Sequence, residues 1–167
     1  MKKIFAIMAL IVTSIPAVAV ASPLEAEDAV AYLLAGIQVS KTTNVAGTDL
    51  LWTQNASGRF VGIGSHADGP VHMIMSVRKL TDCTYETSGN VTVAGEVVAS
   101  VAPAVYDFTK IIGIDLLRPN LAGVDAAKGF CTSNEPSMCG SFIDLAVPTD
   151  AATYKQVYQD FRSDHCP

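Results

Sequence analysis

The sequence has few charged residues, only three histidines and a single tryptophan among its 167 residues. Lys and Arg number 11 against 16 Asp and Glu, so the chain lacks the basic surface that binding to a phosphate backbone requires. This balance excludes nucleic acid as a partner. Beyond the first 21 residues no run of 18 apolar residues occurs, which excludes a membrane span in that part of the chain. Half of all residues are nevertheless hydrophobic, too many for a disordered chain.

The first 21 residues have the three parts of a secretory signal peptide. Lys2 and Lys3 precede an apolar run over residues 4–15, and Ala19, Val20 and Ala21 form a small-x-small cleavage site. We therefore expect a bacterial protein that is periplasmic or secreted, with signal-peptide cleavage near Ala21 and a single globular domain over residues 22–167. Without the two leader lysines, nine basic residues remain against 16 acidic ones, a net charge of −7.

Four cysteines follow the leader, and an even number in an oxidising compartment predicts two disulfides. Four cysteines allow three pairings. The seven turn-rich residues between Cys131 and Cys139 favour a bond between these two, which leaves Cys83 to pair with Cys166. The chain contains no Cys-x-x-Cys pair, and the interval from Cys131 to Cys139 is wide for a zinc knuckle, so the spacings disfavour a structural zinc site.

Hydrophobic periodicity predicts a helix at each end of the domain. Apolar residues recur at helical spacing over residues 26–37, with acids in the first turn. The i, i+3, i+4, i+7 pattern returns from Tyr154 to Phe161, after a stop and a cap at residues 148–150. Both helices are amphipathic, so we expect each to pack one face on the rest of the domain.

Between the helices, short β-branched and aromatic runs alternate with turn residues. The predicted strands cover residues 50–54, 59–63, 71–80, 83–87, 91–94, 106–117 and 141–147. The segment 106–117 is ambiguous between strand and helix, and we interpret it mostly as strand because Gly113 weakens a helix. A break is expected over residues 118–123. These elements predict an α+β fold, in which an antiparallel β-meander sheet is flanked by an N-terminal and a C-terminal helix and held by disulfides.

The densest polar cluster, residues 65–72, contains two of the three histidines. His66, Asp68 and His72 would suit zinc or copper if they converged. A four-residue turn at 67–70 would send the histidines to opposite faces, whereas a five-residue loop would place them opposite each other. The alternative interpretation is a solvated hairpin tip. Ser65 and His66 do not fit the Gly-x-Ser-x-Gly pattern of a hydrolase, and neighbouring side chains on a strand point apart.

Trp52, the one tryptophan, lies across the hairpin predicted at 50–63 from Arg59 and Phe60. Residues of these types dominate the energetics of protein interfaces, so together with Phe60 they would form a recognition patch. The alternative is that Trp52 and Phe60 belong to the core.

We expect an exported, non-enzymatic binding domain without a cofactor, whose partner is a protein or a small molecule. Its acidity favours a cationic partner, as in an inhibitor or an immunity-type protein. The candidate binding residues are Trp52, Arg59, His66 and His72. The alternative is a small metal-dependent or hydrolytic enzyme that uses His66, Asp68 and His72. The sequence identifies no catalytic residue and leaves the oligomeric state open.

Overall fold

The structure is a computed structural model that describes residues 25–118, 121–132, 139–146 and 151–167. The described residues form two helices, a 3-10 turn and nine strands in one antiparallel sheet. The elements are α1 (Ala26–Ala35), β1 (Thr42–Val45), β2 (Thr48–Gln54), β3 (Phe60–His66), β4 (Gly69–Thr81), β5 (Thr84–Val93), β6 (Glu96–Asp107), η1 (Phe108–Lys110), β7 (Ile111–Arg118), β8 (Leu121–Thr132), β9 (Gly140–Ala146) and α2 (Ala151–Asp164). The predicted α+β architecture, with a meander between terminal helices, is confirmed.

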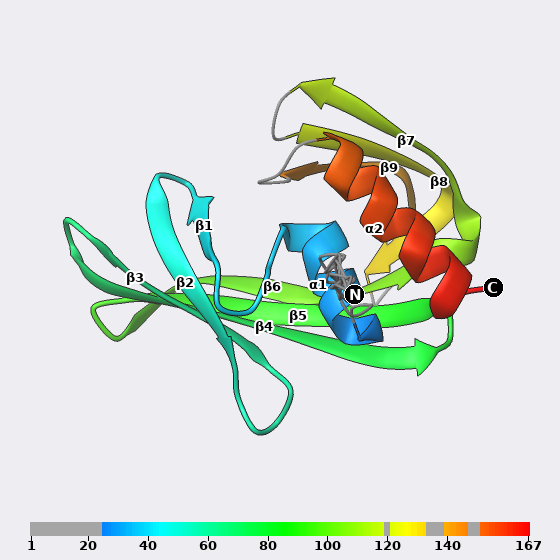
Figure 1. The fold of residues 1–167 in the computed structure, drawn as a ribbon. Helices are drawn as coiled ribbons and strands as arrows, with labels where there is room; N and C mark the ends of the chain where they lie inside the picture. Colours follow the sequence, from blue (N-terminus) through cyan, green and yellow to red (C-terminus); the bar gives the residue numbers. More distant parts are fainter. Residues whose placement is uncertain (1–24, 119–120, 133–138, 147–150) are drawn as a thin grey trace, which may run out of the picture.

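Strands β1 to β6 pair in sequence order, and the order changes only at β8. This strand pairs with three others: β6, β7 and β9. Figure 1 shows that the sheet bends around the helices, with α1 over β4 and β5 and with β7 to β9 on the far side. In agreement, α1 contacts β4, β9 and α2. The curved sheet and the two helices therefore enclose the core between them.

Helix α1 ends two residues earlier than the periodicity predicts. Gly36 adopts a left-handed conformation with φ 64°. Its N–H donates to the carbonyl of Tyr32 at 2.7 Å, and the N–H of Ile37 donates to the carbonyl of Ala31 at 3.3 Å. This is the usual glycine stop of a helix. The last turn is tied to the second helix, because the hydroxyl of Tyr154 donates to the carbonyl of Leu33 at 2.7 Å.

The core has two parts, one around both helices and one beneath the start of the sheet. The first contains Tyr32, Tyr85, Phe108, Phe130, Tyr154 and Phe161 among its buried residues. The second contains Ala31 of α1 together with Ile37, Leu50, Trp52, Phe60, Val71 and Met75. Because α1 contributes to both, it holds the two halves of the sheet together.

The predicted disulfide pairing is confirmed. Cys83 bonds to Cys166, 83 positions away, and Cys131 bonds to Cys139, eight positions away. Two disulfides indicate an oxidising, extracytoplasmic location. Among the described residues no helix is long and apolar enough to cross a membrane. The predicted signal peptide, residues 1–21, lies outside the described residues.

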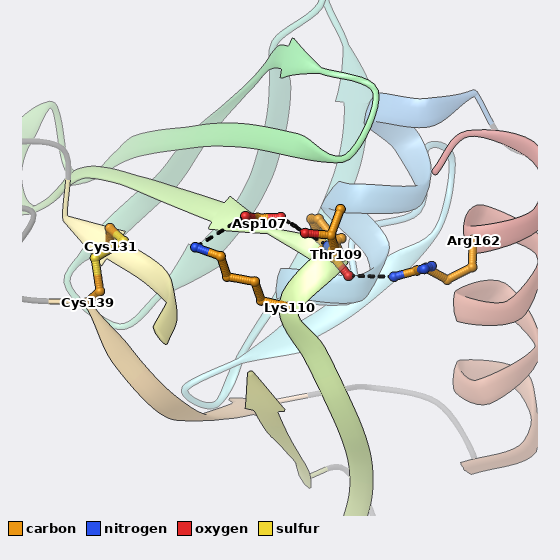
Figure 2. A network of polar contacts seen from close by, with 7 residues as sticks. Asp107, Thr109, Lys110, Cys131, Cys139 and Arg162 are labelled. Carbon is orange, nitrogen blue, oxygen red and sulfur yellow. Dashed lines mark hydrogen bonds and ion pairs between the residues drawn. A yellow bond between two sulfur atoms is a disulfide. The ribbon is translucent and has the colours of Figure 1, made fainter. Parts of the chain in front are cut away.

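A polar network joins α2 to the turn η1 (Figure 2). The Asp107 carboxylate accepts from the N–H of Thr109 at 3.0 Å and from its hydroxyl at 2.6 Å, and pairs with Lys110 Nζ at 3.5 Å. Arg162 donates to the carbonyl of Phe108 at 2.7 Å. These contacts hold the 3-10 turn that interrupts the strand predicted over residues 106–117.

Three strand predictions need correction. Residues 88–90, which separate the predicted strands 83–87 and 91–94, are part of β5. Glycine is suited to position 89 because a Cβ there would contact the backbone carbonyl of Ile74 on β4. Strand β8 begins at Leu121, within the break that was expected over residues 118–123. Strand β1 and residues 96–105 of β6 were not predicted at all.

An apolar pocket as the candidate binding site

A pocket of about 540 Å³ lies on the sheet beyond the end of α1, between the hairpin β1–β2 and the strands β3 to β6. This volume is within the range of about 300–1,000 Å³ that is typical of ligand sites. The lining residues are Val45, Ala46, Thr48, Leu50, His66, Asp68, Val71, Met73, Val91, Val93, Ala94 and Val98. Nine of these twelve are aliphatic or Met, so the pocket is suited to an apolar group.

The strand register explains why apolar side chains gather here. Val71 pairs with Val93, and Met73 pairs with Val91, so four apolar residues share one face of β4 and β5. On β3, Val71 pairs with Gly64, where a Cβ would contact the backbone carbonyl of Asp49. The absence of a side chain at Gly64 therefore lets β2 lie close to β3 at the pocket wall.

Polar groups of the pocket include the pair at the tip of the hairpin β3–β4. His66 pairs with Gly69, which leaves a two-residue turn of Ala67 and Asp68. His66 Nδ1 lies 3.1 Å from Asp68 Oδ2, and the two side chains are 49% and 79% exposed. The pair is thus placed at the solvent side of the pocket, where it can interact with a polar group of a ligand whose apolar part is buried.

His72 lies on the other side of the sheet from His66. It pairs with Ile63, and residue 63 of β3 points to the face opposite to that of positions 64 and 66. The three residues His66, Asp68 and His72 therefore do not converge. In the described part of the chain no group of three His, Cys, Asp or Glu side chains could hold a metal ion.

Trp52 and Arg59 do not form a joint patch. Trp52 is fully buried, and its ring lies against Gly62, where a Cβ would come within 3.0 Å of it. Arg59 is exposed and follows the turn at Asn55, whose side chain accepts from the N–H groups of Ser57 and Arg59. Trp52 is thus a core residue, as in the second interpretation of the sequence.

A second hollow, of about 400 Å³, is acidic. It lies between the start of α1 and the hairpin β2–β3, and its lining includes Glu25, Glu27, Asp28 and Gln54. Burial, and then the charges of Glu25 and Glu27, raise the pKa of Asp28. Its carboxylate accepts from Gln54 Nε2 at 3.5 Å. The hollow adds to the negative surface but offers little apolar surface to a ligand.

Of the residues that line the pocket, His66 and Asp68 were candidates from the sequence, whereas Thr48 and the nine apolar residues were not. Met73, Val91 and Val93 were recognised as strand residues, yet alternation alone does not distinguish a face that is covered by the core from one that borders a pocket. Val98 was not placed on a strand.

No protein-family model, curated protein or solved structure matches this chain.

Proposed function

We propose that this protein is an exported, non-enzymatic binding domain whose pocket takes the apolar part of a ligand or partner. The observation that carries the proposal is the aliphatic wall formed by β1 to β6, with His66 and Asp68 at its solvent side. Apolar surface with a few convergent polar groups is the usual composition of a binding site.

Both the pocket and the net charge contribute to binding. Transfer of apolar surface from water gains about 25 cal/mol per Å², so a group that buries about 100 Å² gains about 2.5 kcal/mol. The negative net charge of the chain attracts cationic partners and speeds their association. We therefore propose a ligand with an apolar part for the pocket and a cationic group near Asp68.

The same geometry argues against the enzymatic alternative. Ser65 neighbours His66 on β3, so their side chains point to opposite faces of the sheet. His66 and Asp68 can position a proton, but within the described ranges no third His, Cys, Asp or Glu joins them. A hydrolase of the serine type needs its nucleophile within hydrogen-bond reach of the base.

Titration with the apolar fluorophore N-phenyl-1-naphthylamine tests the pocket. Val97 and Val98 are a matched pair, because they are neighbours on β6 with exposed fractions of 61% and 59%, and only Val98 lines the pocket. We expect the wild type and Val97→Glu to bind the dye equally. Val98→Glu should weaken binding about tenfold, equivalent to about 1.4 kcal/mol, because it places a charge beside the dye.

A wild type that does not bind the dye would contradict the proposal. So would equal binding by all three proteins, because the dye would then occupy another surface. Circular dichroism of the three proteins checks that the substitutions leave the fold intact.

A further inference from the structure

One edge of β6 is open next to the pocket. Strand β6 pairs with β5 along most of its length, but with β8 only over Ala104, Val105 and Tyr106. In the chain as described, no strand pairs with the opposite edge of residues 96–102. Every residue from 96 to 102 is exposed. The backbone N–H and C=O groups on this edge are therefore available to an added strand.

The side chains of this edge are apolar. Val97, Val98 and Val101 are 61%, 59% and 50% exposed, and Glu96 is the one charged residue of the segment 96–102. Open edges usually carry lysines, prolines or bulges that prevent pairing with other chains. Here β6 itself has a bulge, because Val97 pairs with Thr92 and Ala99 with Val91, which leaves Val98 as the extra residue. A second irregularity with Pro103 follows the segment, but no lysine or proline lies within residues 96–102.

The edge and the pocket form one continuous surface. Val98 belongs to both. Alternate side chains of a strand point to the same face, so a strand that pairs with this edge would direct every second side chain toward the pocket side of the sheet.

We propose that residues 96–102 of β6 receive an extended segment of a basic partner protein, which adds a strand to the sheet and places an apolar side chain in the pocket. The inference rests on the proposed function of the pocket. Backbone hydrogen bonds supply affinity in such strand addition, and the pocket supplies specificity.

The charges near the edge favour a basic segment. Glu96 begins β6, and Asp68 lies in the neighbouring turn. The two turns are joined, because the N–H of Ala94 donates to the carbonyl of Pro70 at 2.8 Å. A lysine or arginine at the end of the added segment would lie near both carboxylates.

A second copy of this chain fits the edge less well. Two copies of a chain with a negative net charge repel each other. Seven residues span only about 24 Å at about 3.4 Å per residue, and a stable interface buries about 800 Å² per partner. A peptide segment needs no such area beyond the edge and the pocket.

The experiment uses peptides selected from a random dodecamer phage library against the immobilised protein. We expect the enriched sequences to combine Lys or Arg with apolar residues. Amide hydrogen exchange then locates the bound peptide. With peptide at about 100 times its Kd, exchange of the edge amides over residues 97–102 should slow by about 100-fold.

N-methylated peptides provide the matched control. Successive N–H groups of a strand point to opposite sides, so methylation of one alternate set should abolish binding and methylation of the other set should not. Equal effects of the two sets would overturn the inference. A library that yields no enriched sequence, or a peptide that protects amides elsewhere on the protein, would also overturn it. Protection of β6 that increases with protein concentration in the absence of peptide would identify a second copy as the occupant and would overturn it as well.

The dye titration separates the two proposals. If the dye binds in the pocket but no peptide protects β6, strand addition is wrong and the proposed function of the pocket stands. If a peptide protects β6 but the dye does not bind and Val98→Glu leaves peptide affinity unchanged, the proposed function of the pocket is wrong, and with it the placement of a side chain there.

Discussion

The two disulfides differ in the length of chain that they close, and this difference predicts unequal contributions to stability. Cys83 and Cys166 are 83 positions apart, whereas Cys131 and Cys139 are eight positions apart. Closing a loop restricts the unfolded chain and so stabilises the folded state. The free energy of unfolding rises by about 4.6 kcal/mol for the long loop and by about 2.6 kcal/mol for the short loop. The pair of substitutions Cys83→Ala and Cys166→Ala should therefore cost about 2 kcal/mol more than the pair Cys131→Ala and Cys139→Ala.

Burial acts in the same direction. Cys166 is fully buried and Cys83 nearly so, and both belong to the core cluster that contains Tyr85 and Phe161. Removal of their sulfur atoms leaves a small void among aromatic rings, and such voids add to the cost of a substitution. The other two cysteines are only half-buried. The difference between the two double variants is thus at least about 2 kcal/mol, a factor of about thirty in the unfolding equilibrium.

Urea unfolding at 25 °C, followed by circular dichroism, measures both losses against the wild type. The slope m is fitted separately for each protein, because removal of a cross-link expands the unfolded chain. Equal losses, or a larger loss from the Cys131 and Cys139 pair, would refute the argument from loop length and burial.

Three further outcomes are expected. Tyr154→Phe leaves the Leu33 carbonyl without its buried donor and should cost about 1–3 kcal/mol at pH 7 in urea unfolding; no loss would contradict this role. Burial raises the pKa of Tyr154, so the neutral form is favoured in the folded state. The stability of the wild type should therefore be complete below a pH of about 10 and fall above it, and fall less in Tyr154→Phe, as urea unfolding at increasing pH would measure. Gly62→Ala brings a Cβ within 3.0 Å of the Trp52 ring and should cost about 1–3 kcal/mol, with a change in tryptophan fluorescence, whereas the exposed Ser65→Ala should change stability by less than about 0.5 kcal/mol.

The elements that the sequence predicts well are those whose periodicity is strong. Both helices have apolar stripes at helical spacing, and α1 departs from its predicted end only because Gly36 stops it. The hairpin β2–β3 is recognisable from its turn residues, since Asn55 and Gly58 supply the side-chain acceptor and the positive φ that the turn uses. In these segments local chemistry and tertiary packing favour the same structure.

The elements that the sequence does not predict lack a clear alternating pattern. Residues 96–105 contain four valines, but three alanines, a serine and a proline stand among them, and β8 contains three alanines and two glycines. Pairing with the neighbouring strands holds both segments in the sheet. Gly89 was placed outside the predicted strands, although it lies within β5. It resembles a turn residue locally, yet its position is set by the backbone of Ile74 on the neighbouring strand.

The candidate site was hard to predict for a related reason. Trp52, His66 and His72 attract attention by their chemistry, but the turn of two residues after His66 separates the histidines, and packing on Gly62 buries Trp52. The pocket depends instead on cross-strand pairs of ordinary apolar residues. Such pairs become visible only once the register is known.

The segment 96–102, which the sequence leaves unassigned, also carries three exposed valines. Val97, Val98 and Val101 are 50% to 61% exposed, although burial of a valine side chain is worth about 1.5 kcal/mol or more. Together they retain about 2–3 kcal/mol of hydrophobic stabilisation that this fold does not use. A strand added at the edge of β6 would recover part of it and pair the open backbone groups at the same time. Under the proposed strand addition, burial of these valines would contribute to the affinity for the added strand.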